Sequence, residues 1–195
     1  MEKSLILKGS YGYLKRRTTR VILLTILMFC SAIGVLLIGV MMTGTKKNLL
    51  TIVAILGLLP AARSTTEMIM LLRAKKYTCS AALHDAICEK IPVSDQEFMR
   101  YDLYMTAYEH NFPMYALGCK AGSLVCFMGD AKQTEKDVKS HIEKLIKQNA
   151  LKIGNIKIYF SETKFIERLA EMHSGENEFT EMDQKILRLM ENISL

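Results

Sequence analysis

The sequence lacks the short motifs that identify most enzyme and nucleotide sites. It has no HExxH helix, Walker loop, GxGxxG turn or EF-hand loop. Internal repeats and low-complexity tracts are missing too. Four histidines, His84, His110, His141 and His173, fall in different predicted elements, which favours packing or surface positions over metal ligands or a triad. We therefore expect no cofactor from the motifs.

A CxxC pair is also missing. The spacings of Cys79, Cys88, Cys119 and Cys126 match no common zinc site, and Cys30 lies in an apolar run. We interpret the four later cysteines as scattered buried thiols. A cytoplasmic domain keeps its thiols reduced, so a disulfide framework is not expected.

Charge is absent from the 22 residues of Val21–Met42. As a helix, this run covers about 33 Å, enough for the hydrocarbon core of a bilayer. A secretory signal has a shorter apolar part, and the following residues 43–47 offer no small-x-small cleavage site. The run therefore predicts a retained membrane span at about 21–42.

A second span is predicted at about 49–72. Its apolar part before Arg63 covers only about 21 Å, so the span must continue as one tilted helix. Arg63 and Glu67 lie one turn apart and form an expected i,i+4 pair, and charges inside a membrane are functional candidates. Alternatively, Arg63 extends to the headgroups. Pro60 predicts a kink.

Basic residues surround the two spans unequally. Six precede the first span, three follow the second and two lie in the loop between them: Lys3, Lys8, Lys15, Arg16, Arg17 and Arg20; Arg73, Lys75 and Lys76; Lys46 and Lys47. The positive-inside rule then places both termini in the cytoplasm. We expect a multi-pass protein of the cell (inner) membrane, with the lipid bilayer as a partner.

The net charge of +6 is distributed in the same way. Residues 1–76 carry 12 Lys and Arg against 2 Asp and Glu, a net of +10, whereas residues 77–195 carry 14 against 18, a net of −4. Anionic headgroups explain a basic excess beside a membrane. A nucleic-acid partner is not expected, because the predicted domain has no basic stripe.

After the spans, hydrophobic periodicity predicts alternating helices and strands. Helices are expected at 77–91, 134–149, 161–173 and 180–195, and strands at 101–108, 114–120, 124–128 and 155–160. The order α-β-β-β-α-β-α, followed by a C-terminal amphipathic helix, predicts an α+β domain. The expected organisation is a basic cytoplasmic segment at 1–20, a transmembrane hairpin at 21–72, a cytoplasmic domain at 77–173, and a linker and helix at 174–195.

Two local details follow from turn and cap residues. If Gly122-Ser123 forms a type II′ turn, Cys119 lies opposite Cys126. Thr134 and Asp137 have the spacing of a capping box.

The C-terminal helix, residues 180–195, starts at Thr180 and Asp183. Its apolar face consists of Met182, Ile186, Leu189 and Ile193. This face needs a neighbour, so we expect it to contact a protein partner or a second copy of the chain.

The order of elements over residues 77–160 resembles the core of the restriction-endonuclease-like superfamily. That resemblance implies a magnesium site made of an acidic residue near the second strand and an acid-x-Lys triplet on the third. The nearest residues here are Glu109, Asp130 and Lys132. The alternative interpretation makes Asp130 a turn residue and Lys132 a solvated one.

A second resemblance concerns the second span. The stretches 58–64 (LLPAARS) and 68–73 (MIMLLR) look like those of uncharacterised bacterial two-span membrane proteins with a cytoplasmic domain. This resemblance implies an architecture and brings no activity with it.

Three hypotheses remain open. The leading one is an integral membrane protein that anchors a non-catalytic cytoplasmic interaction or regulatory domain. The second is a membrane-tethered, metal-dependent hydrolase that uses Glu109, Asp130 and Lys132. The third is an oligomeric transport component that uses Arg63 and Glu67, since two helices alone cannot enclose a pore.

Overall fold

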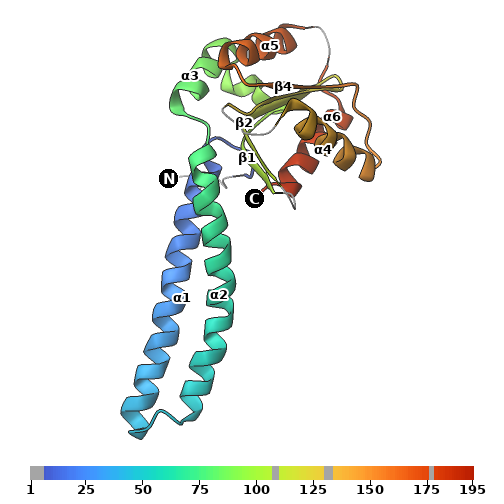
Figure 1. Ribbon diagram of the computed structural model, residues 1–195. Helices are drawn as coiled ribbons and strands as arrows, with labels where there is room; N and C mark the ends of the chain where they lie inside the picture. Colours follow the sequence, from blue (N-terminus) through green and yellow to red (C-terminus); the bar gives the residue numbers. More distant parts are fainter. Residues whose placement is uncertain (1–6, 107–109, 130–133, 176–177) are drawn as a thin grey trace. The chain divides into compact units, whose positions relative to one another are not determined.

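The computed structural model describes residues 7–106, 110–129, 134–175 and 178–195. The chain divides into two compact units (Figure 1). One unit is Lys15–Lys76. The other, which we call the domain, is formed by the chain on both sides of that unit, up to Leu14 and again from Tyr77 onwards.

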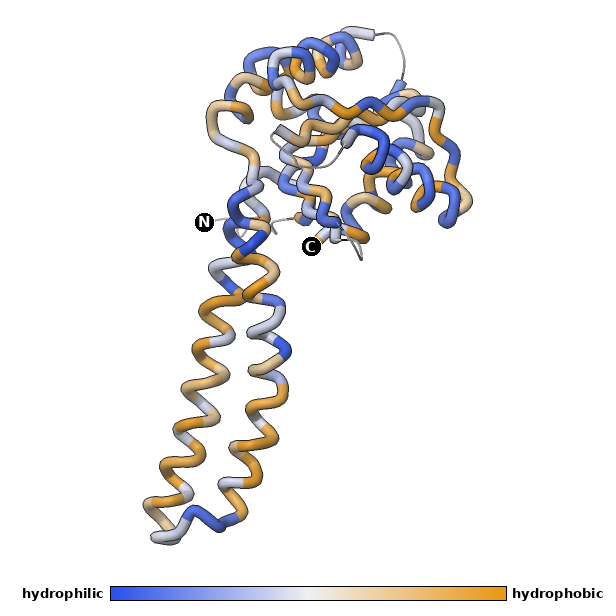
Figure 2. The backbone as a smooth tube through the Cα atoms, in the orientation of Figure 1, coloured by the Kyte–Doolittle hydropathy of each residue, from blue (hydrophilic) through white to orange (hydrophobic). Residues whose placement is uncertain are grey.

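Two antiparallel helices form the first unit. α1 covers Tyr13–Thr43 and α2 covers Leu49–Ala74, which correspond to about 46 and 39 Å of helix. By length and composition both are able to cross a membrane. Figure 2 shows apolar residues along both helices between hydrophilic ends. The predicted spans lie within them, and α2 continues through Pro60 as one helix.

A single asparagine organises the loop between the two helices. The side-chain oxygen of Asn48 accepts the backbone N–H of Thr51 at 2.8 Å, which caps α2. Its amide nitrogen donates to the Thr43 hydroxyl at 2.8 Å and to the Thr45 carbonyl at 2.9 Å. The loop is therefore held by hydrogen bonds at both helix ends.

The domain is built on a four-stranded mixed sheet of order β1-β2-β3-β4. β1 (Met99–Thr106), β2 (Asn111–Lys120) and β3 (Ser123–Phe127) form an antiparallel meander. β4 (Asn155–Tyr159) returns parallel to β3, after a connection that contains α4 (Glu135–Gln148). This confirms the predicted α+β fold class and the predicted order of elements.

Helices cover both faces of the sheet (Figure 1). α4 and α6 (Glu181–Ile193) pack on one face, where Ile142, Ile186 and Met190 are fully buried. α3 (Ala81–Lys90) and α5 (Glu162–Ser174) pack on the other face around Phe165 and Leu169. Two short 3-10 helices, Lys75–Tyr77 and Val93–Phe98, complete the elements described.

Helix α6 packs on the sheet of its own domain, and the predicted apolar face is buried in part: Ile186 is 0% exposed, whereas Met182 is 39% exposed. Ile186, Leu187 and Met190 are 0% exposed and belong to the same core as β1 and β2. Beyond the helix, the backbone N–H of Leu195 donates to the Tyr104 carbonyl of β1 at 2.9 Å. The sheet therefore already contacts part of the predicted face, and an outside partner for this helix stays a prediction.

The β2–β3 turn also differs from the prediction. Lys120 pairs with Ser123, so the turn residues are Ala121 and Gly122, with φ of 52° and 68°. Two successive positive φ angles are the pattern of a type I′ turn. Cys119 consequently lies opposite Leu124 rather than Cys126. The predicted register failed because alanine is a poor sequence signal for a left-handed turn position.

Strand β1 changes its side-chain alternation in the middle. Tyr101 belongs to the core under α3 and α5, whereas Leu103, two residues later, belongs to the core under α4 and α6. Between them Asp102 has a φ of 54° and leaves the ladder. This irregularity turns the Asp102 side chain out of the normal alternation of the strand. The side chain then accepts hydrogen bonds from Gly12 and Cys79.

Candidate functional site

Asp102 is a buried carboxylate that joins two distant segments of the chain. It is 2% exposed, and its two oxygens accept the backbone N–H groups of Gly12 at 2.8 Å and Cys79 at 2.7 Å. Leu14 contributes a further backbone N–H. Gly12 and Leu14 lie just before residues 15–76, and Cys79 follows them. One side chain therefore fixes the domain's chain segments on both sides of the helical hairpin.

The same segment before the hairpin is held at a second point. The backbone N–H of Tyr101 donates to the Gly9 carbonyl at 2.7 Å, which adds this segment to the edge of β1. Nearby, the Tyr11 ring stacks on the His84 ring with centroids 3.9 Å apart. The residues before α1 thus contact both β1 and α3.

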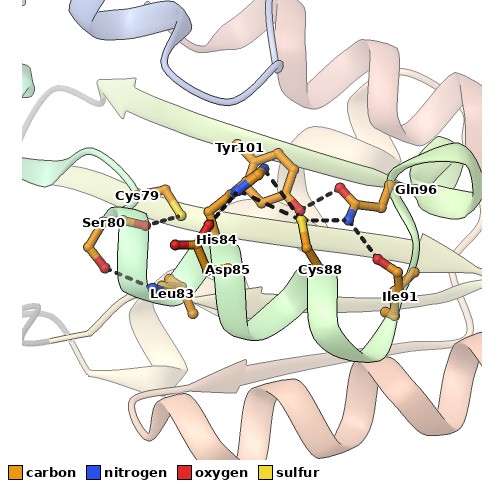
Figure 3. Close-up of polar contacts among 9 residues, drawn as sticks. All are labelled: Cys79, Ser80, Leu83, His84, Asp85, Cys88, Ile91, Gln96 and Tyr101. Atoms are coloured by element: carbon orange, nitrogen blue, oxygen red, sulfur yellow. Dashed lines mark hydrogen bonds and ion pairs between the residues drawn. The ribbon is translucent and has the colours of Figure 1, made fainter.

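A polar cluster, which we define as His84, Cys88, Gln96 and Tyr101, is formed by side chains of α3, the 3-10 helix Val93–Phe98 and β1 (Figure 3). The Tyr101 hydroxyl donates to the Gln96 side-chain oxygen at 2.7 Å. The Gln96 amide donates to the Ile91 carbonyl at 2.9 Å and lies 3.5 Å from the Cys88 sulfur. The sulfur lies 3.7 Å from each ring nitrogen of His84.

Burial raises the pKa of two groups at this cluster, the Cys79 thiol and the Tyr101 hydroxyl. It raises the pKa of the Cys79 thiol to about 12, with the Asp102 carboxylate as a further cause. Burial is also the main reason that the pKa of the Tyr101 hydroxyl is raised. Both groups are therefore neutral near pH 7 and act as hydrogen-bond donors. Together these contacts hold α3 against β1, close to Cys79, where the chain re-enters the domain after residues 15–76.

The pKa of Asp102 is also raised. Burial raises it most, and the hydrogen bonds from Cys79, Gly12 and Leu14 and the charge of His84 offset only part of that effect. The carboxylate is thus hydrogen-bonded at a position where its charge is costly.

A second buried carboxylate, Asp183, holds α6 against the β2–β3 turn. It is 0% exposed and accepts the backbone N–H groups of Ala121 at 2.9 Å, Gly122 at 2.8 Å and Thr180 at 2.9 Å. The Thr180 hydroxyl also donates to it at 2.7 Å, and the Cys119 sulfur lies 3.5 Å away. These contacts explain why Ala121 is able to hold a left-handed turn conformation.

Thr180 and Asp183 also form the capping box of α6. The box expected at Thr134 is incomplete, because the Thr134 hydroxyl bonds to the Asp137 carboxylate and caps no backbone group. Burial by itself raises the pKa of Asp183, but the hydrogen bonds from Gly122, Thr180 and Ala121 outweigh it, so the pKa is lowered.

The residues of the hypothetical magnesium site lie outside the described part of the chain. Glu109, Asp130 and Lys132 all fall in the gaps at 107–109 and 130–133, so their juxtaposition stays a prediction. Within the described residues, no three His, Cys, Asp or Glu side chains gather into a group suited to a metal ion.

The structure gives Glu67 a different partner from the expected one. Its carboxylate pairs with the Arg17 guanidinium of α1 at 2.7 Å, while Arg63 is exposed. The physical reason is the antiparallel packing of the two helices, which also brings the Thr25 and Ser64 hydroxyls to 2.6 Å. The functional role suggested for Arg63 and Glu67 stays a prediction.

Sequence reasoning missed both structural carboxylates. Asp102 was only one polar position in an otherwise apolar strand, and nothing in its neighbours signals a left-handed backbone or a buried charge. Asp183 carries a partial signal, since Thr180 three residues earlier gives the spacing of a capping box. Its bonds to the β2–β3 turn have no signature in the local sequence.

No family model, curated protein or solved structure matches this chain. No family is therefore identified, and the two resemblances above rest on their residues and element order alone. The class that the fold defines is a chain with two long apolar helices near its N-terminus, followed by a small α+β domain.

Proposed function

We propose that the chain is an integral membrane protein whose helical hairpin anchors the α+β domain at the cytoplasmic face of the membrane, with both termini in the cytoplasm. The observation that carries this proposal is the apolar surface of the hairpin. Large apolar side chains are exposed along both helices, including Leu23, Leu27, Leu37, Met41, Leu49, Ile52, Ile55 and Leu59. Contiguous apolar surface of this extent is unfavourable in water and suits a lipid environment.

The domain has the opposite character. Its exposed large apolar side chains are few and scattered, with Val93, Phe160 and Met182 the examples among its described residues from Tyr77 onwards. This contrast supports a division of labour in which the hairpin contacts lipid and the domain contacts water.

The packing of α1 against α2 supports two membrane spans that contact each other along their length. Gly39 lets the helices approach closely, since a Cβ there would lie 2.8 Å from the Leu50 Cβ. At the other end Ser64 lies level with Thr25, and Glu67 with Arg17. Arg63 of α2 therefore lies level with a position of α1 about one helical turn after the start of the predicted first span. From that depth its long side chain is able to reach the headgroups.

The basic flanks support the proposed orientation. Basic residues before α1's apolar part and at the end of α2 outnumber those in the loop, which is the bias of cytoplasmic ends. The carboxylate of Glu67 already forms an ion pair with Arg17. That pairing favours a structural role over the transport hypothesis.

For the domain we propose a binding role rather than a catalytic one. Among its described residues, the buried carboxylates Asp102 and Asp183 each accept hydrogen bonds from backbone donors and so serve the fold. The hydrolase hypothesis depends on Glu109, Asp130 and Lys132, which lie outside the described residues.

The topology is tested with an impermeant maleimide on intact and permeabilised cells. Thr45→Cys, in the loop, should be labelled on intact cells, whereas Lys136→Cys, on the exposed side of α4, should be labelled only after permeabilisation. The unmodified chain is the control for its own thiols. Labelling of Lys136→Cys on intact cells would overturn the cytoplasmic placement, and extraction of the protein by alkaline carbonate would overturn the anchor.

A further inference from the structure

The sheet of the domain ends at β4, and the outer edge of this strand is open. β4 is hydrogen-bonded to β3 on one side, and no other described strand pairs with it. The N–H of Asn155 and the carbonyl of Tyr159 both point to the β3 side. Because backbone groups alternate in direction along a strand, those of Ile156 and Ile158 point to the outer edge. Such an edge is able to pair with another extended chain.

A groove lies beside the start of this strand, between α4 and the segment that follows it. Its volume is about 450 Å³, within the size range of binding pockets. The apolar side chains that line it are Ile146, Leu151, Ile153 and Ile156. The charged side chains around it are Lys139, Lys147 and Lys152, with Glu143 as the one acid among the lining residues.

The charge of this groove is opposite to that of the domain as a whole. Residues 77–195 carry a net charge of −4, whereas three lysines and one glutamate line the groove. A basic groove favours an acidic ligand, because charges of opposite sign are complementary across an interface. The open strand edge beside it favours a ligand that is itself an extended chain.

We propose that the β4 edge and this groove bind an extended acidic segment of a partner protein. The segment adds as a strand along Ile156 and Ile158, so main-chain hydrogen bonds supply affinity. Its alternate side chains then divide between two environments, because successive side chains of a strand point to opposite faces. The carboxylates point to the α4 face and contact the groove residues Lys147 and Lys152, while the alternate side chains point to the α5 face. The proposal goes beyond the membrane anchor and does not depend on which side of the membrane the domain occupies.

The test uses the full chain in detergent and fluorescein-labelled peptides followed by anisotropy. The probe is a seven-residue peptide that alternates glutamate and valine, and a lysine–valine peptide is its charge control. Two further probes carry N-methyl groups on one or the other set of alternate amides. Strand addition predicts that one N-methylated probe fails to bind while the other retains binding, since only one set of amides faces β4.

Matched variants of the protein locate the site. Lys147→Glu with Lys152→Glu should weaken binding of the glutamate probe by about tenfold or more. Lys136→Glu with Lys144→Glu changes the net charge by the same amount, on exposed positions that do not line the groove, and should leave binding within about twofold. Lys152→Gln alone supplies a milder second variant if the double reversal does not fold.

Several outcomes would overturn the proposal. These are no binding of the glutamate probe, equal weakening by both lysine pairs, or equal binding of both N-methylated probes. It also fails if Lys147 and Lys152 instead control binding of anionic lipid vesicles or dimerisation of the chain while the peptide does not bind. None of these outcomes alters the maleimide-labelling result, so the membrane anchor stands or falls separately.

Discussion

Two buried carboxylates of the same domain, Asp102 and Asp183, have the same structural role, but their pKa values are shifted in opposite directions. Each is at most 2% exposed, and each ties together segments that are distant in sequence through backbone N–H groups. Asp102 holds the chain on both sides of the hairpin to β1. Asp183 holds the start of α6 to the β2–β3 turn. Yet the pKa of Asp102 is raised and that of Asp183 is lowered.

The difference lies in the balance between burial and hydrogen bonding. At Asp183 three backbone N–H groups and a hydroxyl outweigh the cost of burial, so the protein stabilises the ionised form. At Asp102 burial outweighs the donors, so ionisation is costly there. We therefore expect loss of the Asp183 charge to lower stability at pH 7 more than loss of the Asp102 charge. Five expected outcomes test this comparison.

The largest effect is expected from Asp183→Asn. An amide in this position keeps one acceptor oxygen but turns an N–H group towards the donors of Ala121, Gly122 and Thr180. Loss of several hydrogen bonds to a charged acceptor should lower the free energy of unfolding by about 3 kcal/mol at pH 7. The measurement is thermal or denaturant unfolding of the full chain, followed by circular dichroism.

Asp137→Asn is the matched control, because this carboxylate is exposed and, among the described residues, accepts a hydrogen bond from the Thr134 hydroxyl. It should cost well under about 1 kcal/mol. An Asp183→Asn variant as stable as this control would remove the structural role assigned to Asp183.

Asp102→Asn should have a smaller effect, about 1–2 kcal/mol at pH 7, because losing the charge also removes its burial cost. The loss should be local. Hydrogen exchange of the Gly12 and Cys79 amides should accelerate in this variant, while the Ala121 and Gly122 amides stay protected. A larger loss of stability than in Asp183→Asn would reverse the comparison.

The two sites should also respond to pH in opposite directions. The pKa of Asp183 is lowered below 3.8, so its contribution is present above that pH and is lost as the pH falls through the folded-state value. The pKa of Asp102 is raised above 3.8, so its contribution is fully present below that pH and is lost as the pH rises through the folded-state value.

The difference in unfolding free energy between the unmodified chain and Asp183→Asn should therefore shrink on acidification, and that for Asp102→Asn should grow. Each slope is bounded by about 1.4 kcal/mol per pH unit for one proton. Denaturant unfolding from pH 3 to pH 7 measures both, and parallel slopes would show that the two carboxylates are equivalent.

These two sites also mark how far the sequence predicts the fold. Periodicity located the helices and strands, because it depends on which side chains face a core, and the faces of β4 and α4 are strongly patterned. The predicted register failed at Cys119, which lies opposite Leu124. The turn residue Ala121 is left-handed, and its N–H donates to Asp183, some sixty residues later, in a contact that also docks α6. Long-range contacts of this kind leave no local pattern.

The candidate sites show the same limit. A charge-free run is sufficient to predict a helix long and apolar enough to cross a membrane, since length and composition set its fit to a bilayer. By contrast, the partner of Glu67 depends on which residue of α1 lies level with it, and the sequence alone supplied Arg63 as the neighbour. The structure supplies Arg17 through interhelical register.

Thr180→Val separates the capping part of the Asp183 site from its turn part. It removes the hydroxyl that donates to Asp183 and accepts the Asp183 N–H, while Ala121 and Gly122 keep their bonds to the carboxylate. Loss of a cap typically costs about 1 kcal/mol, so the effect should be about a third of that of Asp183→Asn. If the two variants lose equal stability, the turn contacts contribute little and the comparison with Asp102 loses its basis.

The smallest effect, with the opposite sign, is expected from Ala121→Gly. Ala121 has a φ of 52°, a conformation that costs an L-residue about 1–2 kcal/mol and costs glycine almost nothing. Glycine also increases the conformational entropy of the unfolded chain, which opposes the gain by about 0.4–1 kcal/mol. The net stabilisation should be about 0.5 kcal/mol, a rise of a few degrees in Tm. Ala150→Gly, at a φ of 54° after α4, is the matched control without a carboxylate. If Ala121→Gly and Ala150→Gly gain the same stability, Asp183 holds the Ala121 backbone without relieving its strain. A loss of stability in Ala121→Gly alone would show that the alanine side chain stabilises the turn.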